Sequence, residues 1–134
     1  MSTSATSTKY KELKTLFEEN IALAIEFAEL SDALEEKYGK IYMVRQFNIA
    51  SSDFCEQCAG LEFEQETKVN LNLRWVINKG AYTRFWLQAI SNTKKEHEKI
   101  CTELVTKVEK AMMTLKSHEE DTKSNYSPDG KIWC

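Results

Sequence analysis

Cys55 and Cys58 have the residue type and the spacing that best suit metal binding. Two thiols three positions apart can hold one ion, and His97 and Cys101 stand one helical turn apart further along the chain. Because thiolate and imidazole groups bind Zn²⁺ tetrahedrally, these four residues form a candidate zinc set. The alternative is that all four are seam or core residues, since free cysteine is among the most buried residue types. The alternative is the stronger one, so we predict neither a metal nor another cofactor.

Catalytic motifs are the next source of chemistry to consider. His97 and His118 are the only histidines, and His97 falls on an apolar stripe with no acid and nucleophile patterned around it. The sequence contains no Gly-x-Ser-x-Gly elbow, phosphate-binding loop or dinucleotide fingerprint. We therefore predict that the protein is not an enzyme and has no small-molecule substrate.

Lysines gather in two stretches of the chain. Lys37 and Lys40 flank the end of one predicted helix, whereas Lys94, Lys95 and Lys99 lie close together in another. The net charge is −3, with 18 basic and 21 acidic side chains interspersed, so no global attraction to nucleic acid is expected. Local lysine clusters can still meet the phosphates of anionic lipids. The sequence leaves open whether these lysines bind such a surface or are simply solvated.

Residues 9–39 are predicted to form a long helix that ends at Gly39. Its side chains recur every seven residues in two series offset by three, which is the pattern of a coiled-coil seam. The two series are Leu13, Asn20, Phe27 and Leu34, and Leu16, Leu23 and Leu30. Asn20 interrupts the apolar pattern, and it is either a buried residue that fixes the pairing register or a partly exposed one.

Residues 82–120 are predicted to form a second long helix, after a local break at Asn78-Lys79-Gly80. Its two series are Leu87, Cys101, Val108 and Leu115, and Ile90, His97, Leu104 and Ala111, with Lys94 as the polar exception. Two helices with matching seams should pair antiparallel, either within the chain or with a second copy. We therefore predict a mainly all-α protein that forms a homodimer through these helical seams.

Residues 41–77 leave two structures open. Apolar and polar residues alternate from Leu61 to Trp75, which favours a β-strand. A strand of about fifteen residues is far longer than the usual five or six, however, and glutamate and asparagine are poor strand formers. The segment is therefore either helical or a β-rich insertion.

The remaining segments set the domain boundaries. Residues 1–8 are small and polar and are predicted to be disordered, and residues 121–134 are predicted to form a polar tail. Between them, residues 9–120 are predicted to form one helical coiled-coil domain, with residues 41–73 as an insertion. The longest uncharged apolar run, Ile21–Ile25, is too short to span a bilayer, and no secretory signal is visible. We expect a cytoplasmic protein.

Two stretches form a pair of motifs. The first is Leu34-Glu35-Glu36-Lys37-Tyr38-Gly39-Lys40, at the end of the first predicted helix. The second runs from Arg74-Trp75 through Asn78-Lys79-Gly80-Ala81-Tyr82 and Trp86 to Glu96-His97, Ile100 and Leu104. Together these motifs resemble the FCH region that opens F-BAR domains, most of all in the syndapin (PACSIN) type. The chain departs from the family in the inserted segment 41–73 and in a shorter interval from Trp86 to His97.

The resemblance implies long antiparallel coiled-coil helices that pair as a dimer. It also implies binding to anionic lipid at plasma or endocytic membranes, and a link from the membrane to the cytoskeleton and to endocytosis. Lys37 and Lys40 fall in the first matched motif and would contact lipid, and local charge adds Lys94, Lys95 and Lys99. The alternatives are a lipid-independent coiled-coil protein-interaction module and a small zinc-stabilised α+β domain.

Overall fold

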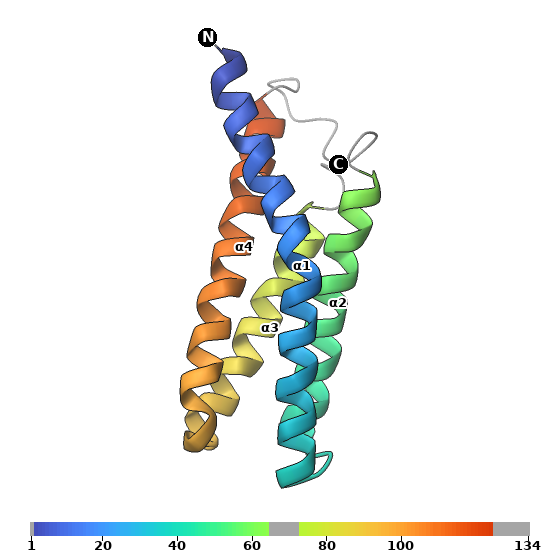
Figure 1. The fold of residues 1–134 in the computed structure, drawn as a ribbon, viewed down its shortest axis with the longest axis vertical. Helices are drawn as coiled ribbons and strands as arrows, with labels where there is room; N and C mark the ends of the chain where they lie inside the picture. Colours follow the sequence, from blue (N-terminus) through green and yellow to red (C-terminus); the bar gives the residue numbers. More distant parts are fainter. Residues whose placement is uncertain (1, 65–72, 125–134) are drawn as a thin grey trace.

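The computed structural model describes the backbone of residues 2–64 and 73–124, and the side chains of residues 11–63 and 73–119. The helices are α1 (Ser2–Tyr38), α2 (Tyr42–Glu64), α3 (Leu73–Thr93) and α4 (Glu98–Ser124), with a short 3₁₀ helix, η2 (Lys95–His97), before α4. Figure 1 shows the long helices side by side, alternating in direction along the chain. Each packs against the next, and α4 also packs against α1, so they form an up-and-down four-helix bundle.

The prediction of a mainly all-α fold is confirmed, because the described residues contain helices and no strand. The alternative of a β-rich insertion is wrong for residues 42–64 and 73–77, which are helical, whereas residues 65–72 lie outside the described part. The physical reason is a buried row in α2 that recurs at steps of three and four residues. This row consists of Val44, Phe47, Ser51, Phe54, Cys58 and Leu61.

The second predicted helix, over residues 82–120, is wrong at its start, and at its other end α4 continues past residue 120 to Ser124. The break expected at residues 78–80 is absent, because α3 begins at Leu73 and runs through them. Gly80 is buried at the centre of the bundle, where a Cβ atom would lie 2.7 Å from Cγ of Met112 and 3.0 Å from Cε1 of Phe54. Glycine therefore serves here for close approach of α3 to α4 and α2, and not as a helix breaker.

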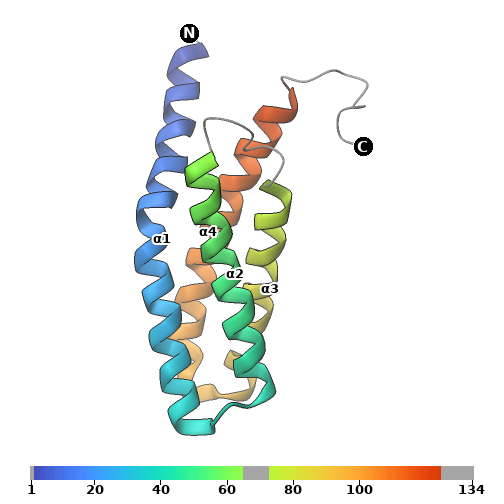
Figure 2. The ribbon, with the colours of Figure 1, turned by 90° about the vertical axis from the view of Figure 1, so that its right-hand side faces the viewer.

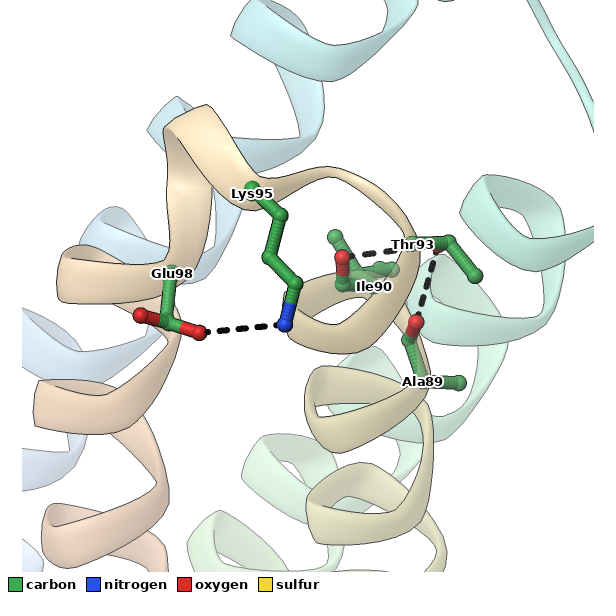
Figure 3. Close-up of polar contacts among 5 residues, drawn as sticks. All are labelled: Ala89, Ile90, Thr93, Lys95 and Glu98. Atoms are coloured by element: carbon green, nitrogen blue, oxygen red, sulfur yellow. Dashed lines mark hydrogen bonds and ion pairs between the residues drawn. The ribbon is translucent and has the colours of Figure 1, made fainter.

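The continuous helix expected over residues 82–120 is instead divided at Lys94, whose backbone leaves the helical region at φ −118° and ψ 74°. Thr93 precedes the break, and its hydroxyl donates to the carbonyl oxygen of Ala89 at 2.9 Å (Figure 3). Such back-bonding bends helices. Lys95 of η2 pairs with Glu98 at 3.4 Å, and Glu98 places a negative charge at the N-terminus of α4.

The turn between α1 and α2 follows the sequence prediction. Gly39 has φ 77°, and its N–H donates to the carbonyl oxygen of Glu35 at 2.8 Å, which is the αL ending of a helix. At its other end α1 extends beyond the predicted start, because residues 2–8, predicted as a disordered segment, belong to the helix.

Most residues of the two heptad seams are buried inside a single chain, whereas Leu23, His97 and Ala111 are partly buried. Seam residues of α1 and α4 face the same core, and they include Leu13, Leu34, Leu104 and Leu115. Asn20 is also buried, and its side-chain nitrogen donates to the backbone oxygen of Cys55 in α2 at 2.9 Å. Asn20 therefore fixes the position of α1 against α2 within the chain. A homodimer through these seams would require the bundle to open, so the pairing of the two helices within one chain accounts for them.

Candidate functional site

The turns α1–α2 and α3–α4 lie at the same end of the bundle (Figure 2). This arrangement brings together all five lysines predicted to bind lipid, and we call this part of the surface the lysine end. Its lysines are Lys37 at the end of α1, Lys40 in the following turn, Lys94 and Lys95 in the second turn, and Lys99 at the start of α4. All five are exposed except Lys94, which is half-buried.

Glu96 lies at the centre of the lysine end. Its carboxylate accepts hydrogen bonds from the Lys37 ammonium and from the Tyr38 hydroxyl. These two bonds, Lys37 first, hold the pKa of Glu96 below its usual value. The same hydrogen bond to Glu96 raises the pKa of Tyr38 to about 12. The ammonium group of Lys94 makes a cation–π contact with the ring of Tyr38, and its Nζ lies 4.5 Å from the ring centre.

The acids at this end neutralise part of its positive charge. Lys37 is paired with Glu96, and Lys95 is paired with Glu98. In the described part of the chain, Lys40, Lys94 and Lys99 have no carboxylate within ion-pair distance. These three lysines are therefore the cations available to an external phosphate, and the sequence pattern alone did not separate them from the two paired ones.

The contact between Tyr38 and Glu96 predicts a specific pH dependence. Because the pKa of Tyr38 is raised, its stabilising contribution is complete below pH 10 and is lost as the pH approaches about 12. The pKa of Glu96 is lowered, so its contribution is present at neutral pH and is lost on acidification below the usual glutamate range. Tyrosinate absorbance in the wild type and in Tyr38→Phe isolates the Tyr38 titration. Glu96→Ala should return its midpoint towards 10, and an unchanged midpoint would contradict the contact.

The candidate zinc set is divided between separate parts of the bundle. Cys55 and Cys58 lie within α2, whereas His97 and Cys101 lie at the α3–α4 turn. Among the described residues, no group of three or more histidine, cysteine, aspartate or glutamate side chains could hold a metal ion. His97 packs edge-on against the ring of Tyr38, with 5.8 Å between ring centres, and its buried Nε2 has no partner within that part of the chain. A zinc-stabilised α+β domain is contradicted because the described residues are helical.

The three described cysteines are buried thiols. Burial raises the pKa of Cys55 and of Cys58 to about 12, with smaller contributions from Glu56 and from Cys55 respectively. Burial alone raises the pKa of Cys101 to about 11. These values disfavour the thiolate form, which is the form that binds metals and attacks electrophiles. Cys55, Cys58 and Cys101 are therefore part of the hydrophobic core.

An aromatic face covers the outer side of α2 and α3, and sequence reasoning did not single it out. Five large apolar side chains on it are more than half exposed: Tyr42, Ile49, Trp75, Tyr82 and Phe85. Tyr42 joins the two helices, since its ring lies 5.8 Å from that of Trp86. Lys79 lies over Trp75 at 4.8 Å. Exposed clusters of aromatic residues mark binding surfaces, and the signal in the sequence was the seven-residue spacing of Trp75 and Tyr82.

These features define the class of protein as a four-helix bundle whose candidate sites are binding surfaces. No protein-family model, curated protein or solved structure matches the chain. The similarity of its two motifs to the FCH region stays a prediction. Among the helices described, none has both the length and the apolar character needed to cross a membrane.

Proposed function

We propose that this protein is a non-enzymatic scaffold that binds the anionic surface of a membrane through its lysine end. The observation that carries the proposal is the meeting of five lysines, from two separate turns of the chain, at one end of the bundle. In keeping with the FCH resemblance, the scaffold would act in the cytoplasm at plasma or endocytic membranes. There it would link the membrane to the cytoskeleton and to endocytosis. The homodimer that the FCH resemblance implies would form through an interface other than the seams that each bundle buries.

The strength of this binding follows from the unpaired lysines. One lysine near an anionic leaflet contributes about 1 kcal/mol, so Lys40, Lys94 and Lys99 together contribute on the order of 3 kcal/mol. Tyr42 stands two residues after Lys40 and is 60% exposed, and amphipathic aromatic rings favour the headgroup layer. We therefore expect weak and reversible binding that depends on both charge and this aromatic side chain.

Co-sedimentation with phosphatidylserine-rich vesicles tests the proposal. The wild type should sediment with these vesicles at low salt and much less at physiological salt, because salt screens exposed charges. Changing Lys40, Lys94 and Lys99 together to Glu should weaken binding about tenfold or more. Vesicles of phosphatidylcholine alone should leave the protein in the supernatant.

A matched control separates a local effect from one of total charge. Changing Lys14, Lys110 and Lys116 to Glu alters the net charge equally but affects exposed residues of α1 and α4 away from the lysine end. This variant should retain binding within about twofold. The proposal fails if the control loses binding as strongly as the first variant, or if the wild type does not bind at low salt.

The second candidate function is a lipid-independent protein-interaction module. It is favoured by the length of the aromatic face, which extends to Trp75 near the start of α3, far from the lysine end. Trp and Tyr are the residues most enriched at the energetic centres of protein interfaces. If the folded protein does not bind anionic vesicles at either salt concentration, the protein-interaction module becomes the better assignment.

A further inference from the structure

A groove of about 1050 Å³ runs between α1 and α4, apart from both the lysine end and the aromatic face. Its floor is apolar: Leu23 of α1 and Ala111 of α4 are partly exposed there, above the buried side chains of Leu16, Phe54 and Cys58. Met113 of α4 lines it and is 72% exposed, so an apolar wall is open to solvent. Figure 1 shows α1 and α4, the two helices that border the groove.

The two rims of the groove carry opposite charge. Glu12, Glu19 and Glu26 stand on the α1 side, together with Lys11, and Lys107 and Lys110 stand on the α4 side, together with Glu109. Glu26 and Lys107 pair across the groove at 2.7 Å, and Glu109 is held by Arg84 of α3 at 3.2 Å. The charges left to meet an occupant are therefore acidic along most of the α1 rim and basic at Lys110 on the α4 rim.

The length of the groove suits a short helix. Its lining spans residues 11–26 of α1 and 106–117 of α4. At a rise of 1.5 Å per residue, these stretches are about 22 Å and about 16 Å long, which is the length of a helix of about 11 to 15 residues. A helix of that length presents three or four apolar residues along one side.

We propose that the groove binds an amphipathic helix of a partner protein. The partner helix has about four turns, an apolar stripe at positions i, i+4, i+7 and i+11, basic residues on one flank and acidic residues on the other. Its stripe rests on the floor of the groove, its basic flank faces Glu12 and Glu19, and its acidic flank faces Lys110. This is recognition of a helix in a groove, in which the apolar residues supply affinity and the flanks set orientation.

Synthetic 15-residue peptides test this proposal at low salt by fluorescence anisotropy. All share one apolar stripe, and their flanks are one basic and one acidic, both basic, or both acidic. The mixed peptide should bind at least about threefold more tightly than either other peptide, as expected for one or two favourable ion pairs. The net charge of −3 favours the basic peptide non-specifically. A preference for the mixed peptide therefore shows that the charged residues on the two rims of the groove recognise its flanks.

Variants locate the binding. Met113→Glu places a charge on the apolar wall and should weaken binding of the mixed peptide about tenfold or more. Ile21→Glu is the matched control, since Ile21 is 73% exposed but does not line the groove, and it should leave binding unchanged. Lys110→Glu makes both rims acidic and should shift the preference to the basic peptide.

Several results would overturn the proposal. Equal binding of all three peptides, no binding of any, or equal loss in Met113→Glu and Ile21→Glu would each do so. A wild-type dimer that Met113→Glu converts to a monomer would show that a second copy of the chain occupies the groove. Thermal unfolding of each variant confirms that the bundle is intact before binding is compared.

Discussion

Gly80→Leu is expected to destabilise the bundle by about 3 kcal/mol or more, which is a large part of the stability of a small domain. At Gly80, α3 lies close to its neighbours, since side-chain atoms of Met112 in α4 and Phe54 in α2 lie within 3.0 Å of a Cβ atom placed there. A leucine can be accommodated only if the side chains of Met112 and Phe54 shift or α3 moves away from both helices. Guanidinium unfolding followed by circular dichroism measures the loss.

Alanine variants make this expectation sharper. Replacing a helical glycine by alanine normally stabilises a helix by about 1 kcal/mol. Gly60→Ala should do so, because a Cβ atom at Gly60 meets nothing within 4 Å. Gly80→Ala should instead lower the free energy of unfolding by about 1 kcal/mol, since crowding against Met112 exceeds the gain in helix propensity. Equal effects of the two variants would contradict the close packing of α3.

The buried thiols should react with Ellman's reagent far more slowly in the folded protein than in the unfolded one. A rise in pKa from 9.0 to about 12 lowers the thiolate fraction of Cys55 and Cys58 at pH 8 by about a thousandfold, and the rise to about 11 lowers that of Cys101 by about a hundredfold. Burial hinders access of the reagent as well. Reaction should then occur mainly through opening of the bundle.

The experiment uses a Cys134→Ser variant, because Cys134 lies outside the described residues and the remaining thiols are then all assigned. Three thiols should react quickly in guanidinium and none at a comparable rate in buffer. Fast reaction of a folded thiol, assigned by mass spectrometry of the labelled peptide, would show that its residue is not held in the core. Gly80→Ala should speed up the folded-state reaction, since it lowers the free energy of opening.

Two of the four helices were recognisable from the sequence because large aliphatic residues occupy their buried rows. Leu13, Leu34, Leu104 and Leu115 are all buried where the heptad pattern placed them. The pattern is reliable there because the spacing of side chains around a helix depends only on its own geometry. The prediction of an all-α protein depended on these two segments.

The other two helices were obscured by the composition of their buried rows. The row in α3 includes Gly80 and Thr83, and the row in α2 includes Ser51, so small or polar residues stand where a hydrophobic pattern is sought. At the same time the exposed side chains of Phe63 and Trp75 produced an alternation that resembles a strand. Tertiary packing explains the first effect, since close approach of helices requires small residues at the contact.

The break in the helix at Lys94 could not be predicted from the sequence. No proline or glycine stands between Ala81 and His97, so the usual signals of a helix end are missing. In the structure, the turn is held by contacts distant in sequence, in which Lys94 lies over the ring of Tyr38 and Glu96 binds Lys37 and Tyr38. Such contacts exist only once the α1–α2 turn and the α3–α4 turn lie at the same end of the bundle.

The sequence by itself determined the helical character of α1 and α4, their buried faces and the local clustering of the lysines, because each of these depends on residues a few positions apart. Only the tertiary structure decided that both seams are satisfied within one chain and that the two lysine clusters meet. The reason is the up-and-down path of the chain, which returns the α1–α2 turn and the α3–α4 turn to the same end of the bundle. The same path places Glu96 against Lys37, 59 positions apart in sequence, so the charge of that end is a property of the fold.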